Sequence, residues 1–95
     1  MQEQYYIVRG SQSGVYFGKI KEKNGANVVM ENARMLWYWD GAASVMQIAA
    51  EGVKRPKECK FTMAVNEIEI IDAIATIPCT PEAVNIIKDV KEWKR

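Results

Sequence analysis

The sequence predicts a small α+β domain in which two short helices join a small antiparallel β-sheet or half-open barrel of about five strands. β-branched and aromatic residues alternate with polar ones through much of the first half of the chain, as in half-buried strands. The pair Asn24-Gly25 indicates a hairpin, because both residues tolerate a positive φ. Thr80-Pro81-Glu82 indicates a helix start with a capping hydroxyl, a proline in the first turn and an acid at the positive end of the helix dipole.

The first three strands follow from this pattern. Tyr5–Arg9 is a β-branched and aromatic strand, and 10–14 is a polar loop with glycine at both ends. Val15–Lys23 is the second strand. The returning strand runs from Ala26 to about Trp39, and because it exceeds the usual strand length we expect it to be bent or bulged.

The end of that long strand is apolar on both faces. Leu36 and Tyr38 point to one side, whereas Met35, Trp37 and Trp39 point to the other. Such a strand has to be covered on both faces, and a chain this short struggles to supply two cores. We therefore expect a helix, a second subunit or a ligand to cover the second side.

A helix is expected next. Residues 40–44 open it, with Asp40 as the expected capping residue, and it runs to about Glu51 with Gly52 as its stop. The basic loop 53–60 that follows is most simply explained as a solvated surface.

The last strands are harder to place. Phe61, Met63 and Val65 alternate as a fourth strand. Residues 68–77 fit strand and helix spacing alike, and their isoleucine content favours a strand that ends at Pro78.

The final helix follows Thr80, and Trp93 lies in the basic tail after it, where it could pack back onto the domain. The apolar face of this helix consists of Ala83, Ile86, Ile87 and Val90.

Length and charge limit the possible functions. The 95 residues (1–95) are expected to form a single domain, and 13 basic against 12 acidic residues give a net charge of +1. Proteins that hold long nucleic acid usually have a clear positive excess, so this role, including that of a single-strand-binding barrel, is disfavoured. No apolar run approaches membrane-spanning length, and the N-terminus lacks the pattern of a signal peptide. We expect a cytoplasmic protein that does not contact a membrane.

Catalytic and metal-binding residues are sparse. The chain has no histidine, and Cys59 and Cys79 are isolated, so we expect these thiols to be reduced and buried. No glycine-rich phosphate loop or nucleophile elbow is present. We expect neither an enzyme nor a metal or cofactor site.

Residues 32–44 have the composition of a nucleotide site. Aromatic faces stack on bases, arginine forms paired hydrogen bonds with phosphate, and a small-residue helix start offers free N–H groups. Each part also has a structural explanation. Trp37 and Trp39 could be core residues, Arg34 an ion-pair partner at a surface or interface, and the small residues could allow close helix packing. Asp40 would repel an anion at the helix end.

This segment also resembles a family of small phage-encoded proteins. The likeness covers nearly the whole chain, and its most specific part is Asn-Ala-Arg-x-Leu-Trp-Tyr-Trp at 32–39. Where relatives have a second basic residue after Arg34, this chain has Met35, which weakens the case for a phosphate contact there. The other matching pieces are 6–9, 13–20, 41–44, 51–52, 59–61 and 77–80.

Through that family the chain resembles the phage anti-CBASS sponges. The resemblance implies a homo-oligomer in the host bacterial cytoplasm that sequesters a cyclic dinucleotide, for example cyclic GMP-AMP, without cleaving it. An alternative from the residues is a protein-interaction module that blocks a host factor. The ligand-binding residues expected on this basis are Arg9, Tyr16, Arg34, Trp37, Tyr38, Trp39, Ala43, Ser44 and Lys60.

Overall fold

The computed structural model describes residues 4–94, and its strands form an antiparallel sheet. The predicted α+β class, with two helices, is confirmed. The elements are β1 (Tyr6–Gly10), β2 (Val15–Asn24), β3 (Asn27–Tyr38), α1 (Val45–Glu51), the 3₁₀ turn η1 (Pro56–Glu58), β4 (Lys60–Phe61), β5 (Val65–Ile70), β6 (Ala73–Pro78) and α2 (Pro81–Asp89).

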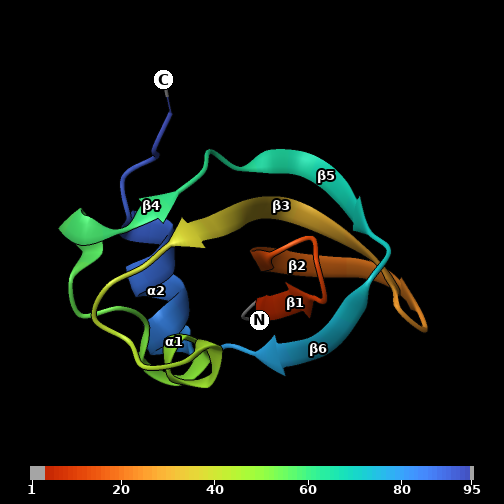
Figure 1. Cartoon of the computed structure of the whole chain (residues 1–95), viewed down its shortest axis with the longest axis horizontal. Helices are drawn as coiled ribbons and strands as arrows, with labels where there is room; N and C mark the ends of the chain where they lie inside the picture. Colours follow the sequence, from red (N-terminus) through yellow and green to blue (C-terminus); the bar gives the residue numbers. More distant parts are fainter. Residues whose placement is uncertain (1–3, 95) are drawn as a thin grey trace.

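The order of the strands explains the half-open shape. The sheet runs β4-β3-β2-β1-β6, and β5 pairs with β3 on the same edge as β4. The turn between β5 and β6 therefore connects the two edges of the sheet. The backbone N–H of Ala73 donates to the Ala26 carbonyl at 3.0 Å, and the N–H of Ser11 donates to the Asp72 carbonyl at 2.9 Å. The helices lie at the opposite end of the molecule from this turn (Figure 1).

Two of the predicted strands differ from the structure. The strand expected at 61–65 is two elements, the short β4 and the start of β5. The strand favoured for 68–77 is interrupted at Ile71-Asp72, where the chain crosses to the other edge of the sheet. The Asp72 carboxylate accepts hydrogen bonds from the N–H groups of Gln12 and Ser13, and these long-range contacts fix the crossing. The sheet consequently has six strands.

The chain supplies two cores, although a chain this short was expected to struggle to do so. Ile7 and Val8 are adjacent on β1 and both are fully buried, on opposite faces of the sheet. Ile7 belongs to the larger cluster, which includes residues from both helices, and Val8 belongs to a smaller cluster with residues of β3 and β5. The curled sheet and the helices thus cover β1 on both sides.

Strand β3 contributes to both cores because it is irregular, as its length predicts. Val28 and Met30 are buried in the smaller cluster, whereas Leu36 is buried in the larger one. Between them Asn32 has φ 49°, and the pairing of β2 with β3 shifts between Phe17 and Lys19. This bulge bends the strand, so that its second half packs against the helices.

Helix α1 starts later than predicted. Ser44 is its N-cap, and the Ser44 hydroxyl accepts a hydrogen bond from the Gln47 N–H at 3.2 Å. Asp40 is not the cap, and its carboxylate instead pairs with Arg55 at 3.6 Å. The predicted stop at Gly52 is confirmed, because its N–H donates to the Ile48 carbonyl and its φ is 78°.

Helix α2 begins as predicted. The Thr80 hydroxyl accepts from the Ala83 N–H at 3.1 Å, and Pro81 occupies the first turn. Ala83 and Ile87 of the predicted apolar face are fully buried. This packing places the C-terminal end of α2 beside β4, next to the end of β3 (Figure 1).

Candidate functional site

A bulge between β3 and β4 determines which aromatic side chains are exposed. Leu36 pairs with Phe61 and Tyr38 pairs with Lys60, so Trp37 is an extra residue on β3 with no partner of its own on β4. At such a bulge, two successive side chains project to the same side of the sheet. Trp37 and Tyr38 are 54% and 49% exposed, whereas Leu36 and Phe61 are buried. The strict alternation expected for this segment is therefore wrong at Tyr38, which is exposed although it was expected on the same side as the buried Leu36.

Trp37 stacks on a residue from the other end of the chain. The rings of Trp37 and Trp93 lie 4.9 Å apart between centroids, with an interplanar angle of 17°. The Lys60 ammonium group lies 5.4 Å from the Trp37 ring and 5.5 Å from the Trp93 ring, within cation–π range. We refer to Trp37, Tyr38, Lys60 and Trp93 as the aromatic platform.

The C-terminal segment is held in place by β4. The Trp93 N–H donates to the Phe61 carbonyl at 2.8 Å, and Glu92 forms a parallel bridge with Phe61. The suggestion that Trp93 packs back onto the domain is therefore confirmed. Trp93 was absent from the residues expected to bind a ligand, because no local pattern indicates that it meets Trp37.

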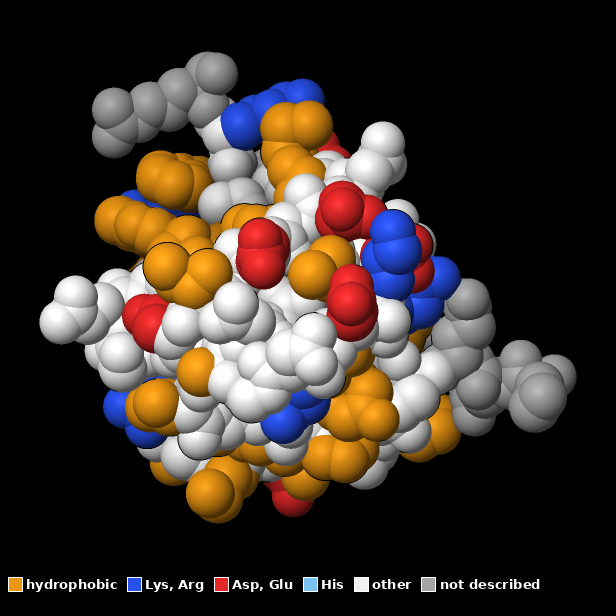
Figure 2. Space-filling view, turned by 90° about the vertical axis from the view of Figure 1, so that its right-hand side faces the viewer, with side chains coloured by type: hydrophobic (Ala, Val, Ile, Leu, Met, Phe, Trp, Pro, Cys, Tyr) orange, Lys and Arg blue, Asp and Glu red, His pale blue; other side chains and the backbone are white. Residues whose placement is uncertain are grey.

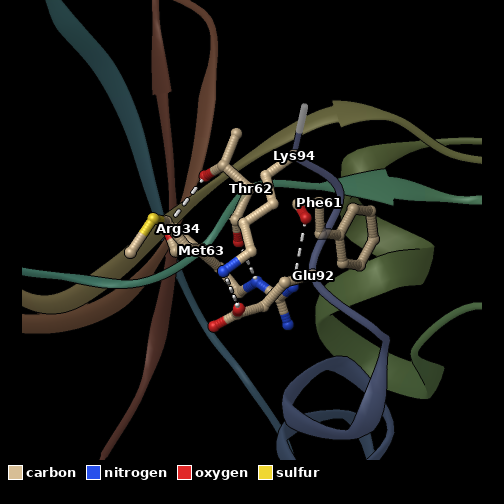
Figure 3. Close-up of polar contacts among 6 residues, drawn as sticks. All are labelled: Arg34, Phe61, Thr62, Met63, Glu92 and Lys94. Atoms are coloured by element: carbon tan, nitrogen blue, oxygen red, sulfur yellow. Dashed lines mark hydrogen bonds and ion pairs between the residues drawn. The ribbon is translucent and has the colours of Figure 1, made fainter.

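Arg34 has a structural role beneath this surface. Its side chain is 7% exposed and its guanidinium donates four hydrogen bonds to backbone carbonyls, of which Figure 3 draws those to Phe61 and Thr62. Nε donates to the Thr62 carbonyl at 2.8 Å, and Nη2 donates to the Phe61 carbonyl at 3.2 Å. Nη1 donates to the carbonyls of Ile87 and Val90, both at 3.0 Å. These bonds fasten β4 to the C-terminal end of α2.

The environment of Arg34 suits a permanent cation. Carbonyl groups at a helix C-terminus carry partial negative charge, so they stabilise the guanidinium without a carboxylate in contact. Burial lowers the pKa of Arg34 from its ordinary value, and the charge of Glu92 acts in the opposite direction. Because four of its five N–H groups are used inside the protein, Arg34 has little left to offer a phosphate.

The other predicted binding residues are dispersed. Trp39 is partly buried against the larger core, and Ala43 and Ser44 precede α1. Tyr16 donates its hydroxyl to the Ser13 carbonyl at 2.8 Å, and Arg9 is exposed on β1 between β2 and β6. Of the nine predicted residues, the structure brings together Trp37, Tyr38 and Lys60. The α1 terminus lies outside this group, and with seven residues the helix is short.

Cys59 and Cys79 are free thiols and both are buried, as the sequence predicts. Burial raises the pKa of Cys79 to about 11 and also raises the pKa of Cys59. Both thiols are therefore protonated at neutral pH and are poor nucleophiles. Within residues 4–94, no three of the side chains Cys, Asp and Glu gather closely enough to hold a metal ion.

The comparisons with known proteins give a single kind of match. A family model described as a domain of unknown function, DUF6948, matches residues 3–87. Neither the curated proteins nor the solved structures give a match. None of the helices in the described part of the chain has the length and apolar character needed to cross a membrane.

Proposed function

The chain belongs to the DUF6948 family, and from this premise we propose that it is a binding protein that holds a nucleotide on the aromatic platform without cleaving it. The sequence resemblance implies a cyclic dinucleotide as the ligand. The corresponding biological role is that of a phage anti-defence sponge, acting in the bacterial cytoplasm as a homo-oligomer.

The exposure of the stacked pair Trp37–Trp93 beside Lys60 supports this proposal most directly. The half-exposed indole of Trp37 at the bulge leaves apolar ring surface in contact with water, and a nucleobase stacked on the ring would cover that surface. The stack with Trp93 holds the ring in place before a ligand arrives, so less conformational entropy is lost on binding. Lys60 adds a positive charge next to the stacked rings, where it could meet a phosphate.

Removal of the exposed indole is expected to weaken nucleotide binding strongly. Base–aromatic stacking contributes about 1–3 kcal/mol, so Trp37→Ala should raise the Kd by about 5- to 150-fold. Isothermal titration against a panel of cyclic and linear nucleotides measures this change. Ile71→Ala, which also removes an exposed apolar side chain, is the matched control and should leave the Kd unchanged.

Two results would overturn the proposal. The first is the absence of heat with every nucleotide in the panel. The second is a Kd that is the same for the wild type and Trp37→Ala. Recovery of the bound nucleotide intact after denaturation distinguishes sequestration from cleavage, and native mass spectrometry of the same sample reports the number of subunits.

A protein-interaction module is the second candidate, because further apolar side chains are exposed on the segment that follows β4. Met63 and Val65 are 48% and 44% exposed, and Val65 pairs with Ala33 on β3, the strand that also contains Trp37. Exposed aromatic and apolar residues of this kind often anchor protein partners. Specific retention of one host protein, lost in Trp37→Ala, together with silent nucleotide titrations would favour this function.

A further inference from the structure

A basic groove lies close to the aromatic platform. It has a volume of about 660 Å³ and is formed between residues 54–58 on one side and the end of α2 with Lys91 on the other. Its charged lining residues are Lys54, Arg55, Lys57, Glu58, Asp89 and Lys91. Arg55 is paired with Asp40, whereas none of the three lysines forms an ion pair within residues 4–94. Three ammonium groups are thus available to a ligand.

The net charge of the whole chain conceals this surface. Segments 54–60 and 88–94 together contain seven basic and three acidic residues, although the complete chain has a net charge of only +1. The rest of the chain therefore contains more acidic than basic residues. On the face at the β5–β6 turn, acidic side chains lie near the middle and apolar ones are scattered around them (Figure 2). Four of the seven basic residues, Lys54, Arg55, Lys57 and Lys91, line the groove.

The groove and the platform are connected by two adjacent chain segments. Lys60 follows the groove residue Glu58 by two positions, and Trp93 follows the groove residue Lys91 by two positions. The two segments are hydrogen-bonded to each other where Glu92 bridges Phe61. Two residues of chain span at most about 7 Å, so the edge of the groove lies within about one nucleotide unit of the platform.

We infer that the groove is the phosphate-binding half of the site, and that the ligand is an aromatic base followed by two or more phosphates. This inference rests on the proposed function, because the platform supplies the position of the base. Lys57 and Lys91 line the groove from opposite sides and would bind the phosphates beyond Lys60. Nucleoside polyphosphates, dinucleotides and short single strands share this chemistry.

The test uses adenosine, AMP, ADP and ATP with the full-length protein. The wild type should bind each successive member about threefold to tenfold more tightly, because each phosphate gains a charged contact. In the double variant Lys57→Gln with Lys91→Gln this gain should disappear beyond AMP, whereas the affinity for adenosine should stay the same. Lys21→Gln with Lys23→Gln removes two exposed lysines elsewhere and should preserve the whole series.

The same titrations separate the two proposals. One result would overturn the phosphate-binding role of the groove but keep the proposed role of the platform. In that case the wild type binds adenosine and AMP with no further gain for ADP or ATP, and Trp37→Ala loses this binding. Absence of binding to all four ligands and to a cyclic dinucleotide would overturn both. A cyclic dinucleotide and a short single-stranded oligonucleotide, titrated at two salt concentrations, identify the source of the phosphates. A steep loss of affinity with salt, confined to the oligonucleotide, indicates a single strand.

Discussion

Arg34→Ala is expected to lower the free energy of unfolding by about 3–5 kcal/mol, as is typical when one partner of a buried charged network is removed. In the variant the Thr62 and Val90 carbonyls lose their hydrogen-bond donor, and a space opens between β4 and α2. For a domain of this size the loss is a large fraction of the total stability. Urea denaturation followed by circular dichroism measures it.

Two further variants test whether the loss of stability comes from the hydrogen bonds of the Arg34 guanidinium. Arg34→Lys keeps the positive charge but loses the planar fork, so it should recover only a small part of the stability. Arg9→Ala removes an exposed arginine from β1 and should change the free energy of unfolding by less than about 0.5 kcal/mol. A fully stable Arg34→Ala protein that no longer binds nucleotide would refute the structural role and return Arg34 to the ligand site.

Gly41→Ala is expected to destabilise the protein by about 2–4 kcal/mol, since a side chain there combines a strained backbone with a clash. Gly41 has φ 91°, and an added Cβ would lie 2.7 Å from the Arg55 backbone nitrogen and 2.8 Å from that of Lys54. The Lys54 N–H also donates to the Gly41 carbonyl at 3.1 Å, so the two segments have little freedom to separate. Thermal unfolding of the variant measures the effect.

Gly25→Ala is the matched control. Gly25 also has a positive φ of 58°, but an added Cβ would meet no atom within 4 Å. Only the backbone strain remains there, and the expected cost is about 1 kcal/mol. Equal destabilisation of the two variants would contradict the claim that residue 41 is glycine because the chain at Lys54 and Arg55 passes against it.

The parts of the fold that were predictable depend on local chemistry. Asn24-Gly25 predicts the β2–β3 hairpin correctly, because the positive φ of 58° that the turn requires at Gly25 is a local property of glycine. Thr80 and Pro81 give the start of α2 for the same reason. The division of residues 60–78 into three strands was missed, since it depends on contacts of Asp72 with a loop about sixty residues away.

The site was predicted in part. The aromatic composition of β3 allows both exposed rings and core packing, and a single bulge decides that Trp37 and Tyr38 are exposed. The stack of Trp37 with Trp93 and the bonds of Arg34 to the Ile87 and Val90 carbonyls each join residues more than fifty positions apart. No periodicity in the sequence indicates such contacts. The net charge of the whole chain likewise does not reveal that basic residues gather at the groove, because acidic residues elsewhere in the chain balance them.

The indole N–H signals of the three tryptophans test the central claim most directly, in a two-dimensional ¹⁵N–¹H spectrum recorded during a nucleotide titration. If the ligand binds on the aromatic platform, the signals of Trp37 and Trp93 shift together, while that of Trp39, packed against the core, stays in place. Trp37→Phe assigns the first signal. Saturating nucleotide that moves none of the three signals, or that moves Trp39 alone, would contradict the account.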